Sequence, residues 1–348
     1  LYGADASAGV IQIITKKGSR GDQGIEWSAR AEGGESEWAL TIPTNYALCT
    51  PARIADAKWV GCQGIDPNAP AAQRVISQNP LRDDPDALRK GSDLNYSLSA
   101  RGGGDRYSFY LSGERQEQDG VFYNNFFDRT SGRGNFTVNP RDGLDLAFSM
   151  GYSRTNTRLP LNDNASNGLL RNAMRGIPGL QGPFAVGWRG LSPTEVNMYN
   201  NQALGERFVV GLTTNYKPIS WFQNKLTLGL DMDSRLSTLF YNIDRTGKAP
   251  YGATNATGFI GQYVPKTHNW TLDYAGTITN NLPRDMVSNL SVGMQVNAYR
   301  FRSVQANGEG LLSDNTRLVS SAAVTHGFEN FSEVNSAGFF VQEQVGWH

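Results

Sequence analysis

The chain has 348 residues, of which 39% are hydrophobic, and its mean hydropathy of −0.44 is low for a protein of this length. It carries 32 Lys and Arg against 32 Asp and Glu, so neither net charge nor a basic run indicates nucleic-acid binding. No apolar run approaches the roughly 20 residues that a membrane-spanning helix needs.

The chain opens with LYGADASAGVIQIITKKG, a glycine-rich stretch that runs into an expected strand. A phosphate-binding loop is excluded, because Gly3 and Gly9 have the wrong interval and Lys16 and Lys17 come only after that strand. The first residue is not a methionine and the chain stops inside an alternating pattern at 346–348. We therefore expect an internal piece of a longer protein.

Period-two alternation is the strongest regularity in the chain, and it predicts strands with two unlike faces. In SDLNYSLSAR, Leu94, Tyr96 and Leu98 share one face, whereas Asn95 and Ser97 share the other. The pattern recurs often enough to predict about ten strands, most of them longer than the usual length of about 5 to 6 residues. They are expected at 24–33, 92–102, 104–115, 127–138, 143–156, 204–217, 223–238, 264–279, 287–303 and 331–348.

The connections between these strands alternate between short and long. Short turns rich in Gly, Pro, Asn and Asp are expected at 102–105, 139–143, 217–222 and 280–286. Long polar connections are expected at 34–91, 116–126, 157–203, 239–263 and 304–330. Tight turns at one end and long loops at the other are typical of outer-membrane β-barrels. The sequence therefore predicts an all-β fold, a partial transmembrane antiparallel β-barrel; a soluble β-sandwich or β-helix with one wet face is the alternative.

Two cysteines, Cys49 and Cys62, lie close together in the first long connection. They are either unrelated thiols or a disulfide that closes a loop in an oxidising compartment. A disulfide across so short a loop would contribute about 3 kcal/mol.

The sequence gives no support for catalysis or for a cofactor. The three histidines, His268, His326 and His348, are far apart, and neither a zinc-binding spacing nor a G-x-S-x-G motif is present. We therefore expect neither a metal site nor a bound cofactor, and the protein is not expected to be an enzyme.

If the apolar faces of the strands look outward, the opposite faces direct charged residues of both signs toward a water-filled lumen, where they could contact a polar solute. These ligand-path candidates are Arg101, Arg106, Arg129, Arg133, Asp145, Asp231, Asp233 and Asp273. The alternative is that they pair across strands or hold a plug in place.

One strand departs from the alternation. In AGFFVQEQVGW, the face that carries Phe339, Val341 and Val345 also carries Glu343. A carboxylate that faces lipid is unfavourable, so either Glu343 lies near an interface or a β-bulge shifts the phase of the strand.

The long connections are rich in aromatic residues, whose faces suit sugar rings or peptide side chains. The candidates for ligand contact are Trp38, Trp59, Trp188 and Tyr199. The alternative is that these rings bury one another inside compact loops.

The opening stretch resembles the last part of the plug domain in TonB-dependent outer-membrane receptors of the SusC/RagA-like branch, where Tyr-Gly, small residues and a strand ending in Thr-Lys-Lys-Gly precede the barrel. Residues 94–163 and GFFVQEQVGW resemble the same branch. The resemblance implies that residues 1–20 end a plug and that 21–348 form the N-terminal part of a plugged barrel of about 22 strands.

The same resemblance implies the function and the partners. It implies active import of oligosaccharides or peptides across the Gram-negative outer membrane, driven by the TonB complex beside a SusD-like surface lipoprotein, with outer-membrane lipid around the barrel. A TonB box is not present in this sequence, and a cysteine pair in the first long loop is not expected across the family. The alternatives are a passive porin, which would have no plug, and a secreted β-rich enzyme or adhesin.

Overall fold

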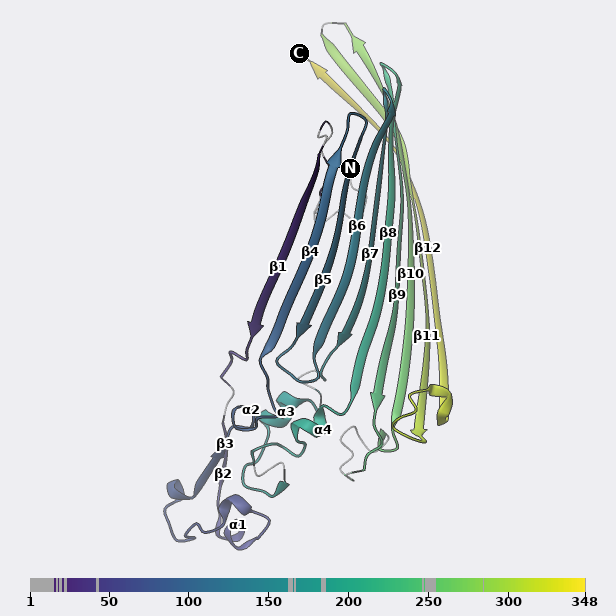
Figure 1. Cartoon of the computed structure of the whole chain (residues 1–348). Helices are drawn as coiled ribbons and strands as arrows, with labels where there is room; N and C mark the ends of the chain where they lie inside the picture. The colour runs from purple at the N-terminus through teal and green to yellow at the C-terminus, as the bar shows by residue number, and fades with distance from the viewer. Residues whose placement is uncertain are drawn as a thin grey trace.

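The structure is a computed structural model that describes residues 16, 18, 21, 24–41, 44–161, 165, 167–182, 186–245, 247, 255–283 and 285–347. The plug strand expected within residues 1–15 lies outside this range. Ten strands form one antiparallel sheet in the order β1-β4-β5-β6-β7-β8-β9-β10-β11-β12 (Figure 1). Every strand of this sheet pairs with its neighbours along the chain, apart from the insertion between β1 and β4. This topology is an up-and-down meander.

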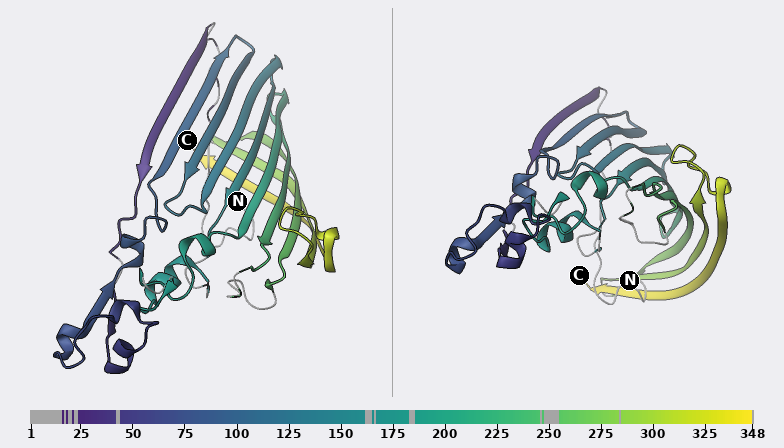
Figure 2. Two further views of the ribbon diagram at one scale, coloured as in Figure 1. Left: turned by 60° about the horizontal axis from the view of Figure 1, so that its bottom comes forward. Right: turned by 90° about the horizontal axis from the view of Figure 1, so that it is seen from below.

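The strands of the sheet lengthen along the chain, and their bounds are β1 Ile25–Ser36, β4 Gly91–Gly103, β5 Tyr107–Asp119, β6 Phe126–Arg141, β7 Leu144–Arg158, β8 Asn200–Ile219, β9 Phe222–Tyr241, β10 Phe259–Leu282, β11 Met286–Leu311 and β12 Ala322–Trp347. All ten expected strands are confirmed. Viewed from below, the sheet curves round into an open trough (Figure 2), so the fold is a partial antiparallel β-barrel.

Short connections join the strands at 104–106, 142–143 and 220–221 and between Leu282 and Met286, and the longer connections all lie at the opposite end (Figure 1). Glycine is required in one of these turns, because Gly143 has a φ of 76° and a Cβ there would lie 2.5 Å from the carbonyl oxygen of Lys217.

Two long connections are shorter than the sequence predicts. Residues 239–263 and 304–330 are expected as loops, but β9 ends at Tyr241, β10 begins at Phe259, β11 continues to Leu311 and β12 begins at Ala322. The extended ends include Phe240, Ile260 and Leu311, which are buried together in one small hydrophobic cluster. Because this cluster joins segments that are far apart in the chain, the alternation of a single strand does not reveal it.

The connections β1–β4 and β7–β8 contain structure that the sequence does not predict. The first holds the two-stranded sheet of β2 (Asn45–Leu48) and β3 (Val75–Gln78) and the short helices α1 (Pro51–Ala55) and α2 (Pro80–Asp83). The second holds the short helices α3 (Leu169–Met174) and α4 (Pro193–Val196). Short 3₁₀ turns occur at Val60–Cys62, Ala71–Arg74 and Val319–Ser321.

These two connections share one small hydrophobic core, which we call the loop core. Its buried members are Leu81, Ala87, Leu169, Ala173, Trp188, Leu191 and Val196. Hydrogen bonds hold the two connections together, among them Trp188 Nε1 to Asp84 Oδ2 at 2.8 Å and the Gly61 amide to the Gly179 carbonyl at 3.0 Å. The loop core therefore joins the two connections into one folded unit at the end of the sheet opposite the tight turns.

None of the helices in the described part of the chain is long and apolar enough to cross a membrane.

Candidate functional site

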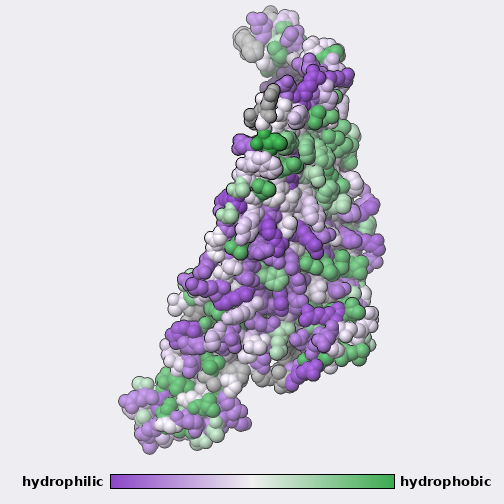
Figure 3. All heavy atoms as spheres, in the orientation of Figure 1, coloured by the Kyte–Doolittle hydropathy of each residue, from purple (hydrophilic) through white to green (hydrophobic). Residues whose placement is uncertain are grey.

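The register of the sheet separates side chains into two faces. One row across the sheet contains Phe136, Phe148, Leu212, Leu228 and Leu272, which are paired strand by strand and define the apolar face. The next row, one residue away on each strand, contains Asn135, Ser149, Gly211, Gly229 and Thr271 and defines the polar face. Hydrophobic residues gather over the part of the sheet near the tight turns, and hydrophilic residues dominate nearer the long connections (Figure 3).

Two described residues that precede β1, Lys16 and Gly18, lie against the sheet. Asn135 Nδ2 donates a hydrogen bond to the Lys16 carbonyl at 2.7 Å. Gly18 passes so close to β4 and β5 that a Cβ there would lie 2.3 Å from the Phe109 carbonyl oxygen. Only glycine allows this approach. The polar face is therefore the side of the sheet on which the Lys16 carbonyl lies.

The register places seven of the ligand-path candidates on the polar face, namely Arg101, Arg129, Arg133, Asp145, Asp231, Asp233 and Asp273. Arg106 is different, because it lies in the tight turn after β4 and donates to the Pro140 carbonyl at 3.3 Å. The strand expected at 104–115 begins only at Tyr107, so Arg106 lies outside it and the expectation that its side chain faces a lumen is wrong.

Three of the candidates are held by ion pairs on the polar face. Arg101 donates through Nε to Glu26 at 2.9 Å, and Arg129 donates through Nη2 to Glu114 at 3.1 Å. Arg207 donates through Nε to Asp231 Oδ1 at 2.9 Å. These three candidates therefore pair with charged residues on neighbouring strands, which is the alternative to contact with a solute. Sequence reasoning missed Glu114 and Arg207, because a partner on a neighbouring strand is visible only once the register is known.

A groove of about 600 Å³ lies on the polar face across β5 to β8. Its polar lining residues include Ser112, Glu114, Arg129, Ser131, Arg133, Asn135, Ser149, Ser153 and Arg207. Arg133 is exposed and makes no hydrogen bond or ion pair with the residues that the structure describes. Asp145, in contrast, accepts from Asn139 Nδ2 at 3.1 Å. Three arginines line the groove, Arg129, Arg133 and Arg207, and only Arg133 has no hydrogen-bond or ion-pair partner among the described residues.

Two of the aromatic candidates in the long connections belong to the protein interior. Trp188 and Tyr199 are fully buried, with 0% of each residue exposed. The Tyr199 hydroxyl donates to the Leu159 carbonyl at 2.9 Å, and burial, followed by the neighbouring Tyr241, raises the pKa of this phenol. The expectation that these two rings contact a ligand is therefore wrong. Both rings are packed inside the long connections and are not accessible to a solute.

Trp38 and Trp59 remain partly exposed, but each already has a neighbour. The Trp38 ring lies 5.7 Å from that of Phe122, and the Arg53 guanidinium lies 4.0 Å above the Trp59 ring. Such a cation–π contact stabilises the local fold by about 0.5–1 kcal/mol at an exposed site.

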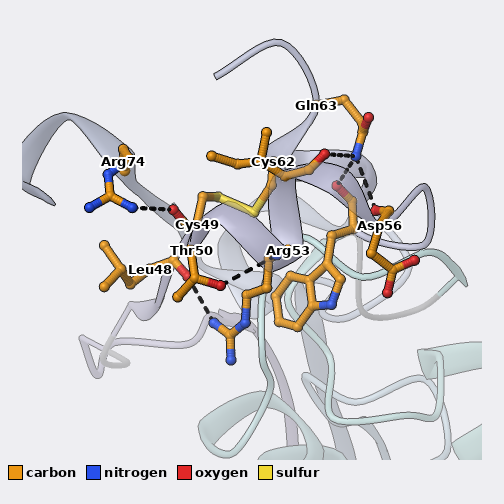
Figure 4. Close-up of a disulfide and its surroundings, with 10 residues drawn as sticks. Leu48, Cys49, Thr50, Arg53, Asp56, Cys62, Gln63 and Arg74 are labelled. Atoms are coloured by element: carbon orange, nitrogen blue, oxygen red, sulfur yellow. Dashed lines mark hydrogen bonds between the residues drawn. A yellow bond between two sulfur atoms is a disulfide. The ribbon is translucent and has the colours of Figure 1, made fainter. Parts of the chain in front are cut away.

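Cys49 and Cys62 form a disulfide that joins the end of β2 to the turn Val60–Cys62 (Figure 4). Both cysteines are fully buried, and hydrogen bonds surround them. Arg74 Nη1 donates to the Cys49 carbonyl at 3.1 Å, and Gln63 Nε2 donates to the Asp56 carbonyl at 3.1 Å. The bridge and these bonds fix the part of the first connection that protrudes farthest from the sheet.

Glu343 lies on the apolar face, and no bulge accounts for it. The pairing of β11 with β12 runs without a shift from Met286 opposite Trp347 through Leu290 opposite Glu343. Ser288 Oγ donates to Glu343 Oε1 at 3.0 Å. Ser288 lies near the tight turn before β11, so Glu343 is at the edge of the apolar rows. This agrees with the expectation that Glu343 lies near an interface.

Within the described residues, no group of three or more His, Cys, Asp or Glu side chains is arranged to hold a metal ion.

The described sheet and its two faces define a section of a β-barrel wall. Neither protein-family models nor curated protein sequences give a match. Among solved structures, the chain is similar to the RagAB peptide importer in its "closed-closed" state, with a TM-score of 0.76 and 17% identity over 100% of this chain and 43% of that one.

Two further solved structures agree. The RagAB peptide transporter gives a TM-score of 0.69 at 16% identity, and the RagAB peptide importer in its "open-open" state gives 0.69 at 14% identity, each over 96% of this chain and 41% of the other. The chain therefore has the fold of part of the RagAB barrel and spans less than half the length of that protein.

Proposed function

We propose that the chain is part of a SusC/RagA-like, TonB-dependent transporter that imports oligosaccharides or peptides across the Gram-negative outer membrane. The observation that carries this proposal is the ten-stranded sheet with one polar and one apolar face, together with its similarity to a peptide importer along the whole chain. The two faces are what a wall between lipid and water requires.

In this proposal the apolar face contacts outer-membrane lipid and the polar face lines the passage. The position of Lys16 against Asn135 supports this assignment, because a plug that precedes the barrel in the chain must enter it from the lumen side. Residues 1–20 would then end the plug, and 21–348 would form the first part of the barrel. No bond of the solute is made or broken, which agrees with the absence of a catalytic motif in the sequence.

The folded connections would stand on the extracellular side. The loop core and the disulfide-linked β2–β3 unit would make a folded surface there, which suits capture of a solute and contact with a SusD-like surface lipoprotein. The TonB complex would supply the energy for plug movement from the periplasmic side, near the tight turns.

The test uses the complete protein in its native host. Cells with and without the gene are given a fluorescently labelled mixture of short peptides and, separately, labelled oligosaccharides, with and without a protonophore. Import that needs both the gene and the proton gradient supports the proposal. Gene-dependent entry that is insensitive to the protonophore indicates a porin instead. Recovery of the protein from the culture medium alone contradicts any transporter.

A further inference from the structure

The groove on the polar face contains three arginines, two of which are paired with carboxylates. Arg129 is bound to Glu114, which also lies 3.5 Å from the Ser131 hydroxyl. Arg207 is bound to Asp231, and its direct neighbour on β9 is Asp233. Each of these two arginines therefore has its charge balanced within the wall.

Arg133 lies on β6 four residues after Arg129, one row beyond the level of Arg207, and has no such balance. Its direct neighbours across the sheet are Ser112 on β5 and Gly151 on β7, neither of which carries charge. Two residues along its own strand lie Ser131 and Asn135. The nearest carboxylate on this face, Glu114, is one diagonal position away and is already held by Arg129.

We infer that the groove beside Arg133 binds a carboxylate of the transported solute. This inference rests on the proposed transport function and narrows its substrate to solutes that carry a free carboxylate. A guanidinium presents two parallel N–H donors that match a carboxylate, and this pairing is stronger than a neutral hydrogen bond. The hydroxyls of Ser112, Ser149 and Ser153 line the same groove and can donate to the remaining lone pairs. The carboxylate could be a peptide C-terminus or the uronate of an acidic sugar.

The experiment uses the complete purified protein with any lipoprotein that copurifies. Binding is measured for a library of short peptides with acetylated N-termini and no Asp or Glu, as free acids and as C-terminal amides. Oligogalacturonate and its methyl ester form the second pair of probes. The proteins compared are wild type, Arg133→Gln, Arg133→Lys and Arg154→Gln.

Arg154 provides a matched control, because it lies on the adjacent strand β7 but on the opposite, apolar face. Its side chain is 62% exposed, and its Nε is 3.8 Å from Glu206 Oε1. Correct folding of every variant is checked by the heat-dependent shift of the barrel on an electrophoresis gel.

The expected result is a preference of about tenfold or more for one free acid over its amide or ester, lost in Arg133→Gln and retained in Arg154→Gln. Arg133→Lys should keep part of this preference, since lysine keeps the positive charge but lacks the two parallel N–H donors of the guanidinium. The probe pair that shows the preference identifies the source of the carboxylate. Equal binding of acid and neutral forms overturns the inference and leaves the transport proposal intact, whereas failure to bind any probe, together with no gene-dependent uptake, contradicts both.

A chemical footprint gives a second readout that is independent of transport. Phenylglyoxal should modify Arg133 in the wild-type protein, and the preferred free acid should protect it while the neutral form should not. Resistance of Arg133 to modification in the folded protein without a probe would show that another part of the protein covers it, and would overturn the inference.

Discussion

The hydroxyl of Tyr199 connects the end of one long connection to the end of β7. It donates to the Leu159 carbonyl at 2.9 Å inside a fully buried site. Replacing Tyr199 by Phe removes the hydrogen bond but keeps the ring, so we expect the opening free energy of residues 159–199 to fall by about 1 kcal/mol. Backbone hydrogen exchange of this segment measures the change. Tyr123→Phe is the control, because Tyr123 is 49% exposed and its hydroxyl lies 3.5 Å from its acceptor. Equal protection in both variants would contradict the prediction.

The same tyrosine gives an expectation about pH. Burial raises the pKa of Tyr199 above the value of about 10 for a free tyrosine. Its stabilising contribution is therefore complete below about pH 10 and is lost only as the pH rises through the folded-state pKa. We expect the difference between wild type and Tyr199→Phe to be constant between about pH 6 and pH 9. A difference that shrinks within this range would show that the phenol ionises in the folded protein.

At the scale of single residues, the sequence predicts faces but not partners. Alternation places Arg129 and Arg133 on the polar face, because every second residue of a strand shares a face. It does not separate the arginine that is bound to Glu114 from the one that is available. Similarly, the sequence shows that Trp188 lies in a loop, but its burial depends on contacts with residues far away in the chain.

At the scale of the elements, β12 carries Glu343 on a face that is otherwise apolar. Since Glu343 pairs with Leu290 near the tight-turn end of the sheet, it should cost little there. Glu343→Leu should stabilise the complete protein by at most about 1 kcal/mol, because charges near an interface cost roughly 0–1 kcal/mol. Urea unfolding in lipid vesicles measures this change.

Val341→Glu is the matched comparison, because it puts a carboxylate one position deeper on the same face, opposite Val292. We expect a larger loss of stability than the gain from Glu343→Leu, though less than the roughly 2–4 kcal/mol of a midplane Arg or Lys. If the two substitutions change stability by the same amount, position 341 is no deeper in lipid than position 343.

The disulfide is the second element whose contribution can be measured. The bridge closes a loop with a sequence separation of 13, for which the chain-entropy model gives about 3 kcal/mol. Replacing both Cys49 and Cys62 by Ser should make residues 50–61 sensitive to protease while the strands of the sheet stay protected, because the β2–β3 unit is separate from the sheet. Mass spectrometry of unreduced, surface-exposed protein that finds both thiols free would rule out the bridge in the cell.

The strands could be predicted from the sequence more completely than the connections. Period-two patterning identifies every strand of the large sheet because one face of each must be apolar over part of its length. The ends of β9 to β12 could not be predicted, since they are stabilised by pairing with neighbouring strands and by the packing of Phe240, Ile260 and Leu311, which lie far apart in the sequence. The loop core could not be predicted either, because its short helices are stabilised by tertiary contacts rather than by their own periodicity.

At the scale of the whole molecule, the ten-stranded sheet is open. In the described chain β1 pairs with β4 and β12 with β11, and both outer strands leave one side of their ladder without a partner. The outer strand β12 also exposes large apolar side chains, with Phe339 81% and Val341 71% exposed. An unpaired strand edge next to such side chains is a template for pairing with other chains.

We therefore expect residues 1–348, when produced alone, to aggregate in water and to form a mixture of sizes in detergent. If the chain is part of a larger barrel, as the proposed function has it, the complete protein should instead run as one species, because further strands would pair with both edges and lipid or detergent would cover the apolar face. Light scattering coupled to size-exclusion chromatography compares the two directly. Replacing Phe339 and Val341 by Ser in the short chain should raise its solubility without making it uniform, since the backbone edges stay unpaired. A water-soluble, stably folded and monodisperse product from residues 1–348 would contradict a membrane-spanning wall, because such a wall must expose both its edges and its apolar face when isolated.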